Sequence, residues 1–280
     1  TLVGTLTTSG DILTSNDNIT FTRAVTLGGA VDIDTTGAAA GNILFSSTIA
    51  TTGNALALDA GAAGNITLSG ALTGGGAMTV RAGAVQNYAA LTAGSLNVQN
   101  AATSVTFNGA VAATTTIDVN SAGSIVQTGA VTSGTTLNYD AATTIAINAA
   151  IAVSSTVNID STGVTTIAAA GDINAGGAVV FGATLVGTLT TSGDILTSDD
   201  NITFTRAATL GGAVAINTGS GIGTIAFNST LNGGQTLSLM AGTGNIEFHG
   251  IVGGTTPLGA VTIVSVSDLT ADAAFNAASL

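Results

Sequence analysis

The sequence predicts an all-β fold, a right-handed parallel β-helix (β-solenoid) of about 13 coils with about 20 residues in each. Three observations lead to this prediction. Apolar residues alternate with polar ones in short runs, the runs recur about every 20 residues, and Gly, Asn, Thr and Ser fill the stretches between them. Period-two alternation is typical of strands with one buried face. A short fixed repeat is typical of coils that stack on one another.

Each repeating unit has apolar residues in the order Φ-x-Φ-x3-Φ and then Φ-x-Φ, followed by a polar residue. A clear example consists of Ile19, Phe21, Val25, Val31, Ile33 and Asp34. No unit carries the i, i+3, i+4, i+7 stripe of a helix, so each unit is predicted to be one coil of two or three short strands. A β-propeller blade repeats at about 40 to 50 residues, and a sandwich needs no fixed frame, so this spacing favours a solenoid. Connections between parallel strands of one sheet are overwhelmingly right-handed, so we expect the coils to wind with that hand.

Stacking turns each position of the unit into a column of side chains. The column headed by Phe21 is predicted to contain Phe21, Phe45, Leu68, Asn87, Phe107, Gln127, Ile147, Phe204, Phe227 and Phe248. The two amides interrupt an apolar ladder. Either they form buried amide ladders with satisfied hydrogen bonds, or the register slips so that Tyr88 points inward. Residues 164–200 fit the frame poorly, and we expect a bulge, a loop or an altered cross-section there.

A longer repeat lies over the short one. Residues 1–31 recur at 184–214, and only two positions differ, Asn16/Asp199 and Val25/Ala208. We therefore expect one continuous solenoid over residues 1–280, in which 1–183 form one cassette and 184–280 begin a second copy. The parent protein is expected to carry this cassette in tandem.

The composition excludes several functions. The 280 residues include three basic and fifteen acidic side chains, for a net charge of -12, with no Cys and no Trp. No basic face is available to neutralise phosphates, so nucleic-acid binding is not expected. Without Cys there is no disulfide framework. No apolar run reaches the roughly 18 residues of a membrane-spanning helix, so no membrane span is expected.

No catalytic constellation is predicted, and we expect no enzyme and no organic cofactor. The single histidine, His249, cannot form a histidine pair for a metal and is expected at the surface. The acids recur in turn positions along the repeat, whereas a catalytic site needs one unique arrangement. Arg23 and Arg206 hold equivalent places in the long repeat. Both are predicted to face outward, beside Asp17 or Asp200, in weak surface pairs.

Two groups of acids are candidate Ca²⁺ ligands. Aspartates that follow the last strand of a unit would bring like charges together in neighbouring coils, and a loop repeated at 11–18 and 194–201 carries further acids. The candidates are Asp34, Asp59, Asp140, Asp160, Asp199 and Asp200. Oxygen ligands suit Ca²⁺, although the spacing is not that of an EF-hand. The alternative is that these side chains cap the backbone of solvated turns.

The frame GNITFxxxLxxGGxVxIxxxG occurs at 41–59, 64–81, 201–217 and 244–263. It resembles the β-strand repeats of large bacterial surface proteins, including filamentous-haemagglutinin-like adhesins and autotransporter passenger domains. The resemblance implies a secreted or cell-surface location, with no catalytic residues to carry over.

Taken together, these features predict a structural, non-catalytic module of an extracellular filament, sheath or adhesin stalk. Its expected partners are copies of itself, through head-to-tail or lateral assembly, and surface glycans are a further candidate. The alternative is a carbohydrate-binding or polysaccharide-degrading β-helix protein. Fibres could form by covalent tandem repeats or by stacking of separate subunits.

Overall fold

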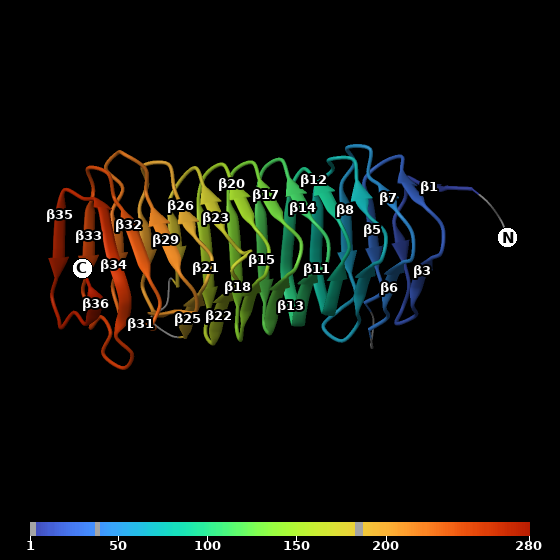
Figure 1. The fold of residues 1–280 in the computed structure, drawn as a ribbon. Helices are drawn as coiled ribbons and strands as arrows, with labels where there is room; N and C mark the ends of the chain where they lie inside the picture. The colour runs from blue at the N-terminus through green and yellow to red at the C-terminus, as the bar shows by residue number, and fades with distance from the viewer. Residues whose placement is uncertain (1–3, 37–39, 183–186) are drawn as a thin grey trace. The chain divides into compact units, whose positions relative to one another are not determined.

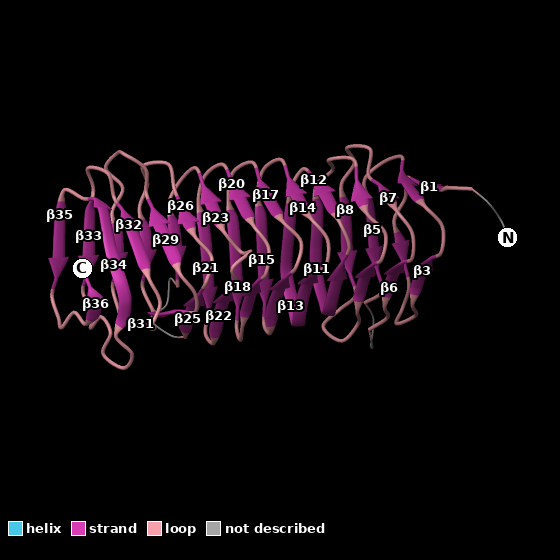
Figure 2. Cartoon of the chain, viewed as in Figure 1, coloured by secondary structure: helices cyan, strands magenta, loops and turns pink. Residues whose placement is uncertain are grey.

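The computed structural model describes residues 4–36, 40–182 and 187–280. The chain divides into two compact units, residues 1–142 and 143–280, and each is described by itself. Within the described residues every regular element is a β-strand, and each unit is a parallel β-solenoid (Figures 1 and 2). The coils number about 13 and start about 21 residues apart, which confirms the predicted fold. The described part of the chain contains no helix able to cross a membrane.

In the first unit the strands line up on three faces. The first face contains β1 (Leu6–Thr8), β4 (Val25–Leu27), β7 (Ile49–Ala50), β10 (Leu72–Thr73), β12 (Leu91–Ala93), β14 (Val111–Ala113) and β17 (Val131–Ser133). The second contains β2 (Ile12–Leu13), β5 (Val31–Asp34), β8 (Leu56–Asp59), β15 (Ile117–Ser121) and β18 (Leu137–Ala141). The third contains β3 (Ile19–Phe21), β6 (Ile43–Phe45), β9 (Ile66–Leu68) and β16 (Ser124–Gln127). Two long strands, β11 (Met78–Tyr88) and β13 (Leu96–Phe107), run from the second face onto the third.

The second unit has the same plan. One face contains β19 (Ile145–Ile147), β22 (Val164–Ile167), β25 (Thr188–Thr191), β28 (Ala207–Leu210) and β31 (Leu231–Asn232). Another contains β20 (Ile151–Val153), β23 (Ile173–Ala175), β26 (Ile195–Leu196), β29 (Val214–Asn217), β32 (Leu237–Met240), β34 (Leu258–Ser265) and β36 (Ala277–Ser279). The remaining face contains β21 (Val157–Ser161), β24 (Val179–Phe181), β27 (Ile202–Phe204), β30 (Ile225–Phe227), β33 (Asn245–Phe248) and β35 (Asp268–Ala271).

The core lies inside the coils, because alternate residues of each strand point inward. β3 and β6 show the pattern, with Phe21 and Phe45 buried and stacked, their ring centroids 4.4 Å apart. In the second unit Phe204, Phe227 and Phe248 form a longer stack, with centroids 4.5 and 5.2 Å apart. In-register stacking thus brings like side chains together in each successive coil.

The register slips at β11, and Tyr88 points inward. Leu68 pairs with Tyr88, so Asn87 is not in the apolar column, and of the two alternatives the slip is confirmed. The Tyr88 hydroxyl donates to Gln86 Oε1 at 2.6 Å, and burial raises the pKa of Tyr88. Gln127 does occupy the column: it pairs with Phe107 and is fully buried.

The predicted column is wrong between Ile147 and Phe204. In the second unit Ile147 is followed by Ile167, whereas Phe204 follows Phe181, which pairs with Ile159. Within residues 164–200 the short frame is therefore displaced by one strand. β24, β25 and β26 form one coil, and the apolar pattern of the frame starts again at β27. What the described residues of this region show is a shift of the repeat from one face to the next, whereas the expected bulge, loop or altered cross-section stays a prediction.

Candidate functional site

Asparagine side chains join successive coils at one turn of the first unit. Asn18 Oδ1 accepts a hydrogen bond from the Asn42 N–H at 2.7 Å, and Asn42 Oδ1 accepts one from the Asn65 N–H at 2.8 Å. Asn65 Oδ1 accepts in turn from the Val85 N–H at 3.1 Å. Each oxygen lies on one coil and each N–H on the next, so these side chains satisfy backbone donors that would otherwise be left unpaired.

Aspartates form a second set of links between coils. In the second unit Asp172 Oδ1 accepts from the Asp194 N–H at 2.9 Å, and Asp194 Oδ1 accepts from the Ala215 N–H at 2.7 Å. The first copy of the long repeat has the same bond, from the Asp32 N–H to Asp11 Oδ1 at 2.9 Å. Sequence reasoning missed these links, although Asx residues at the coil spacing are a signal that could have indicated them. These acids act in coil stacking.

Asp34 and Asp59 are neighbours in the stack, as predicted. They face each other in the pairing of β5 with β8. Asp34 Oδ1 accepts from the Thr36 N–H at 2.6 Å, and Asp59 Oδ1 accepts from the Gly61 N–H at 2.9 Å. Both carboxylates therefore accept hydrogen bonds from backbone N–H groups of turns, which is the role that we gave as the alternative to metal binding.

A cation already lies near this acidic pair. Arg81 makes a bidentate pair with Asp32, with Nη1 and Nη2 at 2.9 and 2.6 Å from the two carboxylate oxygens. The hydrogen bond to Asp32 is the main reason that the pKa of Arg81 is raised, and the charges of Asp59 and Asp34 add to it. The guanidinium thus offsets part of the repulsion that a Ca²⁺ ion was expected to relieve.

Of the other Ca²⁺ candidates, Asp140 lies in β18 of the first unit and Asp160 in β21 of the second. Asp199 has a φ of 66°, its counterpart Asn16 has a φ of 74°, and Asp199 Oδ1 accepts from the Gly221 N–H at 2.5 Å. Asn and Asp tolerate this left-handed conformation better than other side chains. The exposed Asp200 accepts the Thr197 hydroxyl through its backbone carbonyl at 2.5 Å.

Across residues 4–36, 40–182 and 187–280, no three His, Asp or Glu side chains group closely enough to hold a metal ion. A Ca²⁺ site on these aspartates stays a prediction, and Asp34 and Asp59 are one candidate pair that lies on adjacent strands.

Arg206 contradicts the prediction of an outward-facing surface pair. Its side chain is fully buried, and it forms an ion pair with Asp160, two coils earlier, rather than with Asp200. Nη1 also donates to the Ser161 hydroxyl at 3.1 Å. The guanidinium passes over Gly182, where a Cβ would collide with it. A glycine on the intervening coil therefore opens the path from the arginine to the carboxylate.

The environment of Arg206 explains why one charge is tolerated inside the solenoid. Burial lowers the pKa of Arg206, and the charge and hydrogen bond of Asp160 oppose that shift. A buried cation is costly unless it is paired and hydrogen-bonded. The pattern of apolar residues could not indicate this pair, because its members lie 46 residues apart and the glycine between them is one of many.

Arg23, the counterpart of Arg206, is exposed. Among the residues that the structure describes it forms no ion pair, so the predicted contact with Asp17 is not seen. Two arginines in nearly identical segments thus have different surroundings.

His249 lies at the surface, in contact with acids on its own coil and the next. Its Nδ1 lies 2.6 Å from Asp272 Oδ2, and its Nε2 lies 3.4 Å from Glu247 Oε2. The hydrogen bond to Asp272 is the main cause of the raised pKa of His249, and Glu247 contributes less. The side chain is 41% exposed, so this is a surface ion pair.

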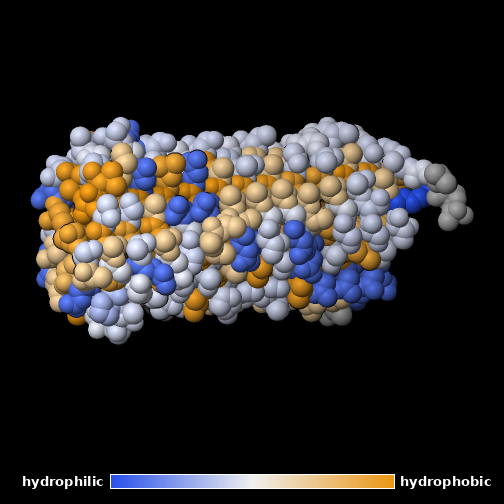
Figure 3. Space-filling view, in the orientation of Figure 1, coloured by the Kyte–Doolittle hydropathy of each residue, from blue (hydrophilic) through white to orange (hydrophobic). Residues whose placement is uncertain are grey.

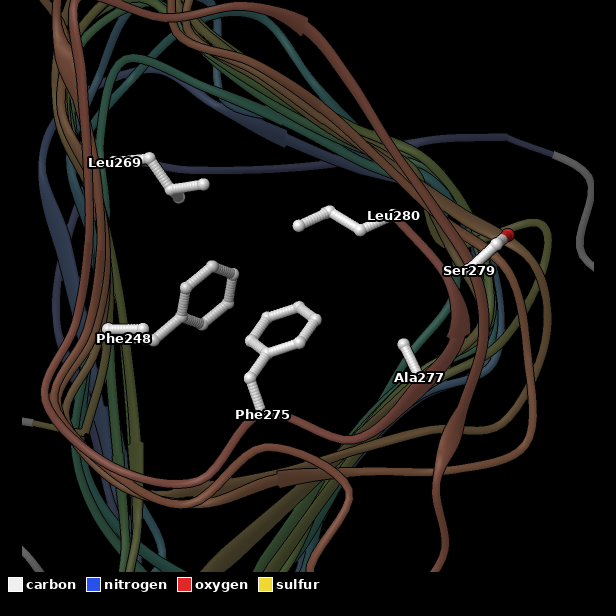
Figure 4. A pocket seen from close by; sticks show the side chains of 7 residues that line it. Phe248, Leu269, Phe275, Ala277, Ser279 and Leu280 are labelled. Atoms are coloured by element: carbon white, nitrogen blue, oxygen red, sulfur yellow. The ribbon is translucent and has the colours of Figure 1, made fainter.

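The last coils of the second unit leave apolar side chains open to solvent. A cavity of about 400 Å³ is lined by Phe248, Leu269, Ala271, Phe275, Ala277, Ser279 and Leu280. Figure 4 shows the Phe248 and Phe275 rings side by side, with Leu269 and Leu280 across the opening. Hydrophobic residues also gather on the surface of these coils (Figure 3), where Val264 is exposed. This is the interior of a coil with one side uncovered.

No protein-family model, characterised protein or solved structure gave a significant match to the chain.

Proposed function

We propose that the chain is a structural, non-catalytic module of an extracellular or cell-surface filament, sheath or adhesin stalk that assembles end to end. The observation that carries this proposal is the use of its polar side chains. Asn18, Asn42, Asp172 and Asp194 each accept a backbone N–H of the following coil, and Arg206 joins coils through Asp160. Side chains that hold one coil to the next support a role in stacking.

End-to-end assembly is proposed because coils that pair in register within each unit can pair in the same way with a coil of another molecule. Among the described residues β1 pairs with β4, and β35 pairs with β33. The extracellular location rests on the resemblance of the repeat frame to bacterial surface proteins.

The test is the concentration dependence of assembly, measured by sedimentation velocity. Leu6 donates its N–H to Ala24 on the next coil, so by alternation along the strand the Thr7 N–H points to the open edge. Thr7→Pro should remove assembly and leave the melting temperature unchanged, because proline blocks only that edge. Leu6→Pro is the control that breaks a bond inside the unit and should lower the melting temperature. A wild-type chain that stays monomeric at all concentrations would refute end-to-end assembly.

A further inference from the structure

Two asparagines of the chain are followed directly by glycine, and the structure holds their side chains in different ways. The pairs are Asn108–Gly109 in the first unit and Asn232–Gly233 in the second. In such a pair the backbone nitrogen of the glycine can attack the side-chain carbonyl carbon of the asparagine, because glycine has no side chain to obstruct the approach. In a folded protein the reaction depends on how firmly both groups are held.

Asn108 lies in the bend between β13 and β14, and its side chain is exposed. In the part of the chain that the structure describes, the carboxamide of Asn108 forms no hydrogen bond, and the Gly109 N–H has no acceptor. No contact therefore has to break before the carboxamide turns toward the glycine nitrogen.

The backbone at this bend is fixed by the coils on either side. The Asn108 N–H donates to the Tyr88 carbonyl at 2.8 Å, and the Asn108 carbonyl accepts the Thr128 hydroxyl at 3.2 Å. A Cβ on Gly109 would lie 2.6 Å from the Ala90 nitrogen, which is too close for a side chain. Packing of the coils thus requires glycine after Asn108, whereas the Asn108 carboxamide takes no part in it.

Asn232 and Gly233 are held by the following coil. Asn232 ends β31, and its Oδ1 accepts the N–H groups of Thr255 at 2.9 Å and Thr256 at 3.4 Å. The Gly233 N–H donates to the Thr256 carbonyl at 3.3 Å. Both reacting groups are engaged with the loop at 255–256, so a reaction between them first needs local opening of that loop.

We propose that Asn108 is a site of spontaneous deamidation in the folded protein. The Gly109 nitrogen loses its proton and forms a bond to Asn108 Cγ, the Cγ–Nδ2 bond breaks, and the amide nitrogen leaves with that proton as ammonia. Water then opens the succinimide ring at either of its two carbonyl carbons, which gives aspartate or isoaspartate at position 108. The inference goes beyond the stacking role proposed above and does not depend on it.

The isoaspartate product should loosen the stack in the first unit. Its main chain runs through Cβ and Cγ, so one additional carbon atom lies between the nitrogen of residue 108 and that of Gly109. The hydrogen bonds that residue 108 makes to Tyr88 and Thr128 then cannot both keep their geometry. The aspartate product keeps the ordinary backbone and adds a negative charge at an exposed position, which has little effect on stability.

The test follows deamidation of the purified full chain at mildly alkaline pH and physiological temperature. Pepsin digestion in acid stops the reaction, mass spectrometry measures conversion at Asn108 and Asn232, and electron-transfer fragmentation distinguishes isoaspartate from aspartate. In the folded chain Asn108 should react at least about 10-fold faster than Asn232, because Asn232 reacts only after local opening. In concentrated urea the two rates should converge, since neither pair is then held by a coil.

Asn108→Thr is the matched variant, because the next coil carries Thr128 at the same place in the stack, one residue after the pairing of Phe107 with Gln127. Fresh variant and fresh wild-type chain should melt at the same temperature. After incubation the wild-type chain should contain a fraction that melts at a lower temperature, in proportion to its isoaspartate content. The incubated variant should not.

No product at Asn108 in the folded chain, under conditions in which the urea-unfolded chain reacts, would overturn the inference. Equal rates at Asn108 and Asn232 in the folded chain would do the same. Isoaspartate that leaves the melting temperature unchanged would overturn the loosening of the stack. None of these results depends on assembly between molecules, which sedimentation velocity measures separately.

Discussion

The Arg206 guanidinium forms an ion pair with Asp160 that spans two coils of the second unit and passes over Gly182. The arginine is fully buried, and 22% of the aspartate side chain is exposed. The pair thus connects the interior of the solenoid with its surface. It also marks the region in which the short repeat slips by one strand.

Asp160→Asn should destabilise the chain by about 3 kcal/mol, because it leaves a buried cation without its counter-charge. Asp118→Asn is the matched control, since it removes one negative charge from an exposed position and should change stability by less than about 0.5 kcal/mol. Urea unfolding followed by circular dichroism measures both. Equal effects of the two substitutions would show that the pair does not stabilise the fold.

Gly182→Ala should destabilise more than Gly53→Ala. Both glycines have a positive φ, 79° and 87°, so both substitutions carry the cost of about 1 kcal/mol for a left-handed residue. Only at Gly182 does the new Cβ collide with a side chain, that of Arg206, whereas the space at Gly53 is open. Thermal melting compares the two, and the double variant Gly182→Ala with Arg206→Ala should recover part of the loss.

Phe227→Ala should cost about 3 to 5 kcal/mol, the usual effect of removing a buried aromatic ring. Phe227 stacks on both Phe204 and Phe248, with centroids 4.5 and 5.2 Å away. Phe21 stacks only on Phe45 among the described residues and is 8% exposed, so Phe21→Ala should cost less. The free energies of unfolding from denaturant titration test this order, and a reversed order would contradict the stacking account.

Much of the fold could be predicted because each coil repeats the same local pattern. Inward residues such as Ile19, Phe21 and Val25 are buried at the positions that the period-two alternation indicates. Either Asn87 or Tyr88 could occupy the inward position that follows Leu68 in the column, since the two residues are adjacent in the sequence. Local alternation cannot decide between them, whereas the pairing with Leu68 does.

The errors arise where contacts between coils decide the outcome. The column from Ile147 to Phe204 was wrong because the frame slips within residues 164–200, and counting apolar residues does not reveal which strand stacks on which. The prediction that Arg206 faces outward was wrong because its partner, Asp160, lies two coils away. Within one coil, a charged residue close to an inward phenylalanine indicates an exposed position. Only the stacking of coils shows that Gly182 leaves space for the Arg206 guanidinium.

His249 should make stability depend weakly on pH. Its pKa is raised above the ordinary 6.5, chiefly by Asp272. The stabilisation is therefore fully present below about pH 6.5 and is lost as the pH rises through the folded-state pKa. Because it is the only histidine, NMR titration of its ring resolves one signal, which should titrate above 6.5 and shift down in Asp272→Asn. A titration at or below 6.5 would contradict the contact.

The calcium hypothesis for Asp34 and Asp59 can be tested through Arg81. Because the guanidinium already offsets the charge of this pair, millimolar Ca²⁺ should change the melting temperature of the wild-type chain little. In Arg81→Gln no cation offsets the repulsion between Asp34 and Asp59, so Ca²⁺ should raise the melting temperature by a few degrees. Asp34→Asn in the same background should remove that response. A large chelator effect on the wild-type chain would show instead that a metal site operates beside Arg81.

The most direct test of the stacking account is cryo-electron microscopy of the purified chain at increasing concentration. The account predicts particles longer than one chain, in which the strand spacing of about 4.8 Å continues across the junctions between molecules. Discrete particles of one chain at every concentration, with no such continuity, would contradict it.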